Sequence, residues 1–418
     1  MDAELDDSLL ADARRGVDEG ELAGAAALVW RRGRVEYAGA VGQRDLQTGQ
    51  PATRDTVFRI ASLSKPVTAL AALRLHDEGR FALDEPISRV APELARARVL
   101  PRPDAPLEQA ALAGRAITFR DLLTHRAGLG YAELLTGPIA EAYAGLGPHI
   151  DNPAAPDEWI AALGELPLVD EPGRRFRYGH ASDLLGFLVA RLDGAPLGEV
   201  LRRRVFEPLG MVDTGFVVPA DRRHRRAGLC GFDEQGRLTP LTVAPGGHAL
   251  AERPPDMTYE SGGQGLWSTV DDFQAFASAL IGDSRGARLL RPETRRLMTT
   301  NQLTAAQRDA ATMFGQPLFD GHGFGMGVAV VMEPARADPS RGRGGVGTVG
   351  WPGAYGAWWQ ADPTNDVVMV FLCHVMADLR QMARGVGLGA WAASAGFHAA
   401  ATRAFSLGAL SGALSGAR

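Results

Sequence analysis

Ser62 and Lys65 are the two residues of this chain whose types and spacing point most directly to chemistry. They stand three positions apart in the segment ASLSKP at 61–66, so on a helix they share one face. A serine hydroxyl is a poor nucleophile until a base takes its proton, and a neutral lysine within hydrogen-bond reach can act as that base. The pattern therefore predicts Ser62 as a nucleophile and Lys65 as its base.

Composition gives Lys65 a second distinction, because it is the one lysine among 44 basic side chains. An arginine cannot give up its proton under protein conditions, whereas a lysine amine can. A position that keeps lysine in a chain otherwise supplied with arginine is expected to need a cation that can also act as a base. Chance survival of a single lysine is the alternative.

The totals describe an ordinary globular chain. Its 418 residues are 45% hydrophobic and 22% charged, which suits one large or two ordinary domains. A net charge of −5 does not indicate a nucleic-acid-binding surface. The acidic start MDAELDD does not resemble a signal peptide, and no apolar run is long enough for a membrane span. We therefore expect a cytoplasmic protein without a membrane or nucleic-acid partner; its oligomeric state is left open.

The patterns of strand-forming and helix-forming residues fall into three blocks. A strand hairpin over 25–41 and a helix over 62–77 come first, followed by a mainly helical middle and by strands over 323–332, 353–362 and 366–374. We predict an α+β fold in which one antiparallel sheet, built from both chain ends and flanked by helices, carries an inserted helical domain. The predicted domains are 1–85 with 310–418, and 86–309, with the active site in the cleft between them.

Tyr178 is the first candidate for a third catalytic residue. It follows a loop rich in arginine, 171–177, and precedes a helical pattern that starts near Ser182. A tyrosine hydroxyl can share a proton with a lysine and so assist it as a base. Taken alone, a tyrosine at a junction of loop and helix is more often explained by packing than by chemistry.

Three motifs in order resemble those of the serine β-lactamase and penicillin-binding-protein superfamily. They are SLSK at 62–65, YGH at 178–180 and WPG at 351–353. Flanking segments agree, and the resemblance covers roughly residues 20 to 375. It is closest to the class C β-lactamase-like esterases, the family VIII carboxylesterases. Their fold is the one predicted above, and they need no cofactor.

The resemblance implies a role for each motif. Ser62 would attack a carbonyl carbon to give an acyl-enzyme, while Lys65 and Tyr178 would share the acid and base work. The segment from Trp351 to Gly353 would lie at the edge of the sheet and line the cleft. The backbone N–H groups of Ser62 and Ala354 would form the oxyanion hole, in which one donor is typically worth about 2.7–4 kcal/mol.

Departures from the β-lactamase motifs bear on the substrate. β-Lactamases of this type carry asparagine where this chain has His180, and lysine where it has Trp351. A lysine there would pair with the carboxylate of a β-lactam, and a tryptophan cannot. We therefore expect a small-molecule ester substrate, with Trp351, Gly353, Tyr355 and His180 in contact with it, although His180 is equally explained as a packed replacement for asparagine.

Several other functions remain open at this stage. The same site suits an acyltransferase, a D-amino-acid peptidase or amidase, or a weak β-lactamase, and a catalytically silent scaffold that binds acyl ligands is the non-enzymatic alternative. The segment GDSRG at 282–286 matches the nucleophile-elbow pattern by letters, but it follows a helical run, so we expect a surface turn. The nine histidines show no metal-ligand spacing, and no metal site is predicted.

Overall fold

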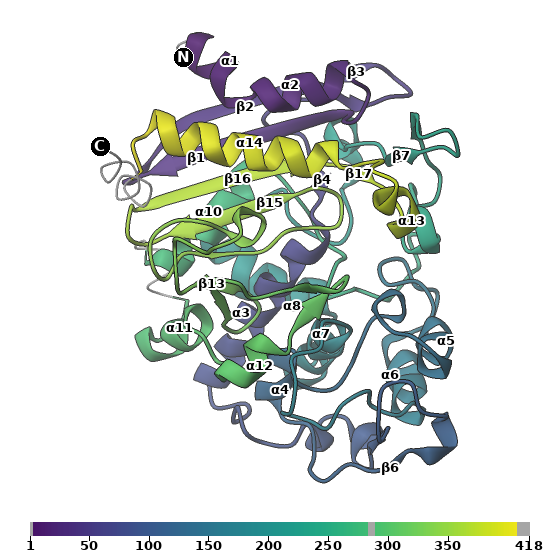
Figure 1. Ribbon diagram of the computed structural model, residues 1–418. Coiled ribbons are helices and arrows are strands. Elements are labelled where there is room, and N and C mark those ends of the chain that lie inside the picture. Colours follow the sequence, from purple (N-terminus) through teal and green to yellow (C-terminus); the bar gives the residue numbers. More distant parts are fainter. Residues whose placement is uncertain (1–2, 283–288, 408–418) are drawn as a thin grey trace, which may run out of the picture.

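The computed structural model describes residues 3–282 and 289–407 (Figure 1). Residues 283–286 of the surface turn predicted at 282–286, and the chain beyond 407, lie outside the described residues.

An eight-stranded antiparallel sheet is built from both parts of the chain, as predicted. Its strand order is β12-β13-β14-β15-β16-β1-β2-β3. Strands from the two ends of the chain meet in the middle of the sheet, where β1 pairs with β16. Ala25 lies opposite Cys373 at one end of this pairing, and Arg31 lies opposite Val367 at the other. The strands are β1 (Gly24–Arg31), β2 (Arg34–Asp45), β3 (Gln50–Pro51), β12 (His322–Phe324), β13 (Ala329–Val331), β14 (Val349–Gly350), β15 (Trp358–Asp362) and β16 (Val367–Cys373).

Helices cover both faces of this sheet, which explains why its central strands are apolar throughout (Figure 1). Successive side chains of a strand point to opposite faces. On β1, Ala26 and Leu28 therefore join the core around α3 (Ser64–Asp77) and α10 (Val270–Ile281). Alternate side chains of the same strand join the core under α14 (Gly389–Ala404).

The middle of the chain is mainly helical. Its helices include α4 (Phe119–Leu123), α5 (Pro138–Ala144), α6 (Pro156–Glu165), α7 (Ala181–Asp193), α8 (Leu197–Leu201) and α11 (Pro292–Thr299). Helix α3 packs against α7 and so joins the sheet to this part of the molecule. The domain boundaries at 85/86 and 309/310 stay a prediction; α10 lies between them in sequence and packs on the sheet. No helix in the described part of the chain is long and apolar enough to cross a membrane.

Two predicted elements differ in the structure. The strand predicted over 323–332 is a hairpin of β12 and β13, because Gly327 adopts a φ of 86° in the turn between them. In the strand predicted over 353–362, residues 353–357 form a turn and only β15 is extended. Both segments carry strand-forming residues, and the glycines within them determine where the chain reverses.

A buried ion pair fixes the chain just before the nucleophile. β4 (Phe58–Arg59) pairs with β9 (Trp267–Ser268). The guanidinium of Arg59 donates to Asp151 Oδ2 at 2.8 Å and to the Leu250 carbonyl at 2.9 Å, and it lies 4.6 Å from the centre of the Trp267 ring. Both members of the Arg59–Asp151 pair are buried, and Arg253 lies 3.4 Å from Asp151 Oδ1 as a second, more distant partner.

We predict that Arg59→Met lowers the free energy of unfolding by about 3 kcal/mol, because the buried Asp151 carboxylate loses its closer counter-ion and keeps only Arg253 at 3.4 Å. Urea unfolding followed by circular dichroism measures the change. Arg34→Ala is the matched control, because it removes an exposed partner of Glu36 and should cost less than about 1 kcal/mol. Equal effects of the two substitutions would contradict this account.

Candidate active site

The structure brings Ser62, Lys65 and Tyr178 together. Ser62 lies in the short 3₁₀ turn Ala61–Leu63 that leads into α3. Its Oγ accepts a hydrogen bond from Lys65 Nζ at 3.1 Å and another from the Tyr178 hydroxyl at 2.8 Å. A hydroxyl held between an amine and a phenol has two groups within reach for its proton.

Ser64, the nearby competitor, points elsewhere. Its hydroxyl oxygen accepts the backbone N–H of Leu266 at 3.1 Å. The side chain is fully buried. It ties α3 to the segment that precedes β9.

Lys65 is buried in a cage of acceptors and aromatic rings. Besides Ser62, its amine donates to the Gly263 carbonyl at 2.9 Å. It lies 4.8 Å from the centre of the Tyr178 ring and 5.5 Å from that of Tyr131. The amine is thus held over the nucleophile by contacts from three separate segments of the chain.

Asp183 supplies the negative charge of this region, and the sequence patterns did not reveal it. Its Oδ1 accepts from the Ser261 hydroxyl at 2.6 Å and from the Gly263 N–H at 3.0 Å, and its Oδ2 lies 3.4 Å from His180 Nδ1. Burial acts to raise the pKa of Asp183, but the bond to His180 and the nearby charge of Lys65 outweigh it, and the net shift is downward. The carboxylate therefore orients the loop whose Gly263 carbonyl holds Lys65.

His180 lies behind the cavity wall rather than in it. Only 1% of the side chain is exposed. The ring packs edge-on against Tyr131, His149 and Trp159, with centroid separations of 4.7, 4.9 and 5.4 Å. Of the two roles left open for His180, packing is the one that this arrangement supports.

His125 packs against the ring of Tyr178. The two rings are 5.2 Å apart, and the His125 carbonyl accepts the N–H of Arg177 at 2.7 Å. Burial lowers the pKa of His125 to about 3, so the ring next to Tyr178 is neutral.

Trp351 contacts the hydroxyl of Tyr178 directly. Its indole N–H donates to that oxygen at 3.1 Å, and the two rings lie 5.3 Å apart. The residue at the third motif thus gives the phenol a hydrogen-bond donor without adding a charge to the site.

The turn after Trp351 determines which backbone amides face the nucleophile. The Gly353 N–H is already used, because it donates to the Ala357 carbonyl at 2.7 Å. Ala354 is exposed and lines the same cavity as Ser62. Ala61, directly before Ser62, has a φ of 45°, an uncommon conformation for a residue with a Cβ. The predicted oxyanion hole of Ser62 and Ala354 is compatible with this backbone, and it stays a prediction.

A cavity of about 290 Å³ opens in front of Ser62. Tyr355, predicted to touch substrate, lines it, although that ring is fully buried and packs 4.7 Å from His374. Among the described residues that line the cavity there is neither lysine nor arginine. Its apolar side chains are mainly Leu134, Ile150, Met313, Phe314, Trp351, Met376, Met382 and Trp391.

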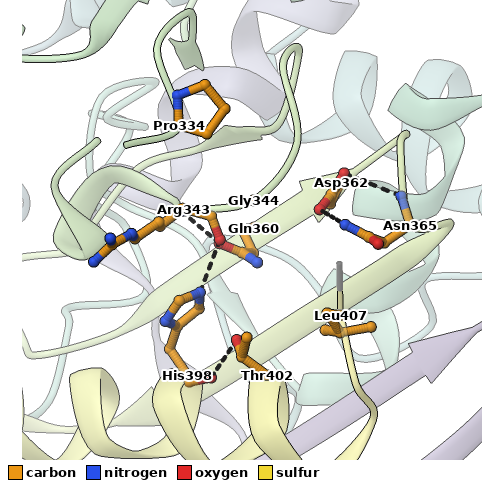
Figure 2. Close-up of a pocket in the computed structure, with 9 residues that line it drawn as sticks. All are labelled: Pro334, Arg343, Gly344, Gln360, Asp362, Asn365, His398, Thr402 and Leu407. Carbon is orange, nitrogen blue, oxygen red and sulfur yellow. Dashed lines mark hydrogen bonds between the residues drawn. The ribbon is translucent and has the colours of Figure 1, made fainter. Parts of the chain in front are cut away.

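A second, much smaller cavity lies between β15 and α14 (Figure 2). Its volume is about 10 Å³, room for roughly one water molecule. The polar side chains around it are engaged: Gln360 accepts the Arg343 N–H, and His398 Nε2 bonds to the Arg343 carbonyl, each at 2.8 Å. Figure 2 shows these groups pairing with one another, so the cavity in front of Ser62 is the candidate site.

Comparison with known proteins agrees with this geometry. A family model described as Beta-lactamase matches residues 10–388. Protein Rv1367c of Mycobacterium tuberculosis is 45% identical over 371 residues, which cover 88% of this chain and 90% of that protein. Esterase EstB of Burkholderia gladioli is 35% identical over 356 residues, or 82% of this chain and 84% of EstB. The solved structure of EstCE1, a hydrolase with promiscuous acyltransferase activity, has a TM-score of 0.76 at 28% identity and covers 95% of this chain and 99% of its own.

We predict that Asp183→Ala slows labelling of Ser62 by a fluorophosphonate probe about 100-fold, because the loop that holds Lys65 loses its acceptor and a small displacement is costly. Asp183→Asn, which keeps an acceptor oxygen, should fall between Asp183→Ala and the wild type. Labelling is followed by mass spectrometry, and circular dichroism verifies folding. Asp271→Asn, at a partly exposed carboxylate, is the control. Labelling at the wild-type rate in folded Asp183→Ala would exclude this positioning role.

Proposed function

The chain belongs to the beta-lactamase family, and from that premise we propose that it is a serine hydrolase that cleaves small or medium carboxylic esters through an acyl-enzyme on Ser62. One observation carries the choice of substrate. In the described wall of the cavity no lysine or arginine faces Ser62, and Trp351 stands at the third motif. A substrate that carries a carboxylate finds no counter-ion there, whereas a neutral ester needs none.

In the proposed acylation, Ser62 Oγ bonds to the ester carbonyl carbon while its proton passes to the neutral amine of Lys65. The N–H groups of Ser62 and Ala354 stabilise the negative oxygen of the tetrahedral intermediate. When the bond to the alcohol breaks, the Tyr178 hydroxyl gives its proton to the leaving oxygen and regains one from Lys65. Lys65 is then neutral again, and Ser62 carries the acyl group.

Deacylation runs the same proton path with water in place of the alcohol. Tyr178 and Lys65 take the proton from the attacking water, and Ser62 recovers a proton as the acid leaves. The hydrogen bond from the Trp351 indole supports this role of Tyr178, because a neutral donor stabilises the phenol oxygen as it loses its proton. The distances of 2.8 and 3.1 Å at Ser62 Oγ are within the range that proton transfer requires.

Acyl transfer to an alcohol is the second candidate. The observation that favours it is the apolar wall of the cavity, which reaches from Trp351 to Phe314 and Trp391. An apolar alcohol gains from burial against such a surface, and water does not. EstCE1, a hydrolase with promiscuous acyltransferase activity, has the same fold. Product analysis in the presence of a short alcohol separates ester formation from hydrolysis.

We predict that Ser62→Ala lowers kcat for a short-chain p-nitrophenyl ester by about four orders of magnitude, since the acyl-enzyme cannot form. Lys65→Arg should have a comparable effect, because it keeps the charge and removes the base. Initial rates give kcat, and Ser64→Ala, which loses only a bond from the Leu266 N–H, is expected to stay within about tenfold of the wild type. Near-normal turnover by either Ser62→Ala or Lys65→Arg would refute the proposed mechanism.

We also predict that a neutral butyrate ester is preferred over a hemisuccinate ester of the same alcohol by at least about tenfold in kcat/KM, a difference that one unpaired charge readily produces. Trp351→Lys should reduce this ratio whatever it does to the absolute rate. Phe314→Lys, at an exposed position of the cavity mouth, should change the ratio less. A ratio that is near one in the wild type would contradict the assignment to neutral esters.

A further inference from the structure

Glu133, His149 and His248 gather in the wall of the cavity that holds Ser62. His248 Nε2 lies 2.7 Å from Glu133 Oε1, and His149 Nε2 lies 3.7 Å from the same oxygen. One ligand atom from each residue lies within 4.8 Å of the other two. Neither the proposed acylation nor the proposed deacylation uses any of the three.

The three residues come from separate segments. Glu133 lies in the 3₁₀ turn Ala132–Leu134, His149 follows α5, and His248 follows the turn Pro245–Gly247. The backbone holds two of these segments together, because the N–H groups of Ile150 and Asp151 both donate to the His248 carbonyl at 3.1 Å. The cluster is therefore a product of tertiary structure, and sequence spacing gave no sign of it.

The separations are close to those between two ligands of one zinc ion, and the shorter one is a hydrogen bond that an ion would replace. Zinc binds imidazole nitrogen and carboxylate oxygen at about 2.0–2.2 Å, so two ligands of one tetrahedral ion lie about 3.3 Å apart. The observed separations of 2.7 and 3.7 Å lie on either side of that value. Two histidines and one glutamate are a ligand set that leaves the fourth position of zinc open.

The surroundings hold the His149 ring in place. His149 Nδ1 lies 3.4 Å from Gln264 Nε2, and its ring stacks on Tyr131 at 4.5 Å. These two contacts fix the orientation of the ring.

We propose that Glu133, His149 and His248 form a binding site for a divalent zinc-type cation, with its open position facing the cavity. The oxygen of a bound water or a substrate oxygen completes the coordination. Gln264, which contacts His149, directly follows Gly263, the acceptor of Lys65. An ion at this site narrows the cavity that serves Ser62 and is expected to inhibit ester binding, which raises KM more than it lowers kcat.

Isothermal titration calorimetry with Zn²⁺ on the metal-free full chain tests the site. We expect one ion per chain, and a tenfold or greater loss of affinity in Glu133→Gln and in His149→Ala/His248→Ala. Replacement by Co²⁺ should give a visible absorption band of four- or five-coordinate cobalt that the double variant lacks. His224→Ala, which removes an exposed histidine outside the cluster, is the matched control and should bind Zn²⁺ like the wild type.

The inference rests on the cavity of the proposed function but not on its chemistry, so Ser62→Ala must bind Zn²⁺ with wild-type affinity even though it is inactive. Tight binding that persists in the double variant would overturn the inference, and so would the absence of binding to the folded wild type. Either result would mean that His248 and Glu133 serve only as a hydrogen-bonded pair in the wall. Neither result would affect the assignment of Ser62 as nucleophile.

Discussion

The buried amine of Lys65 is the constraint on which the rest of the site depends. A polar amine removed from water needs hydrogen-bond partners. The Ser62 hydroxyl and the Gly263 carbonyl lie within hydrogen-bond distance of it, and the Asp183 carboxylate holds the loop that carries Gly263. Because these groups come from the turn before α3, from α7 and from the loop before β9, the surroundings of one amine fix three segments relative to one another.

The charged residues in its wall also determine what the cavity can bind. With its one lysine placed behind the nucleophile, the chain has tryptophan at the third motif, and the described wall carries carboxylates and histidines but neither lysine nor arginine. Trp351 still donates to the Tyr178 hydroxyl. Trp351 thus supplies the hydrogen bond to Tyr178 without the positive charge of a lysine, which would select an anionic substrate. This difference is the physical basis for preferring neutral esters.

The sequence predicted what depends on local patterns. The hairpin of β1 and β2, the helix that carries Lys65 and the strand β16 follow from alternation, helical spacing and turn residues, and they are confirmed. The hairpin of β12 and β13 was predicted as one strand, because strand-forming residues around glycine do not reveal a reversal. Asp183 and the Glu133–His149–His248 cluster were missed because their partners lie far away in the chain. The three motifs of the active site were found only because their order resembles a known family.

The nucleophile and the opposite wall of the cavity share one buried support. The Asp151 carboxylate forms an ion pair with Arg59, which lies three residues before Ser62. The backbone N–H of Asp151 donates to the carbonyl of His248. Displacement of the loop around His248 therefore acts on the strand that leads to the nucleophile, and the reverse also holds. A loop that determines what fits in the cavity would normally be free to vary. Here the Arg59–Asp151 ion pair joins that loop to the strand before Ser62. The backbone around His248 must therefore keep its position for the geometry at Ser62 to be kept, whereas the outer mouth of the cavity is free to vary.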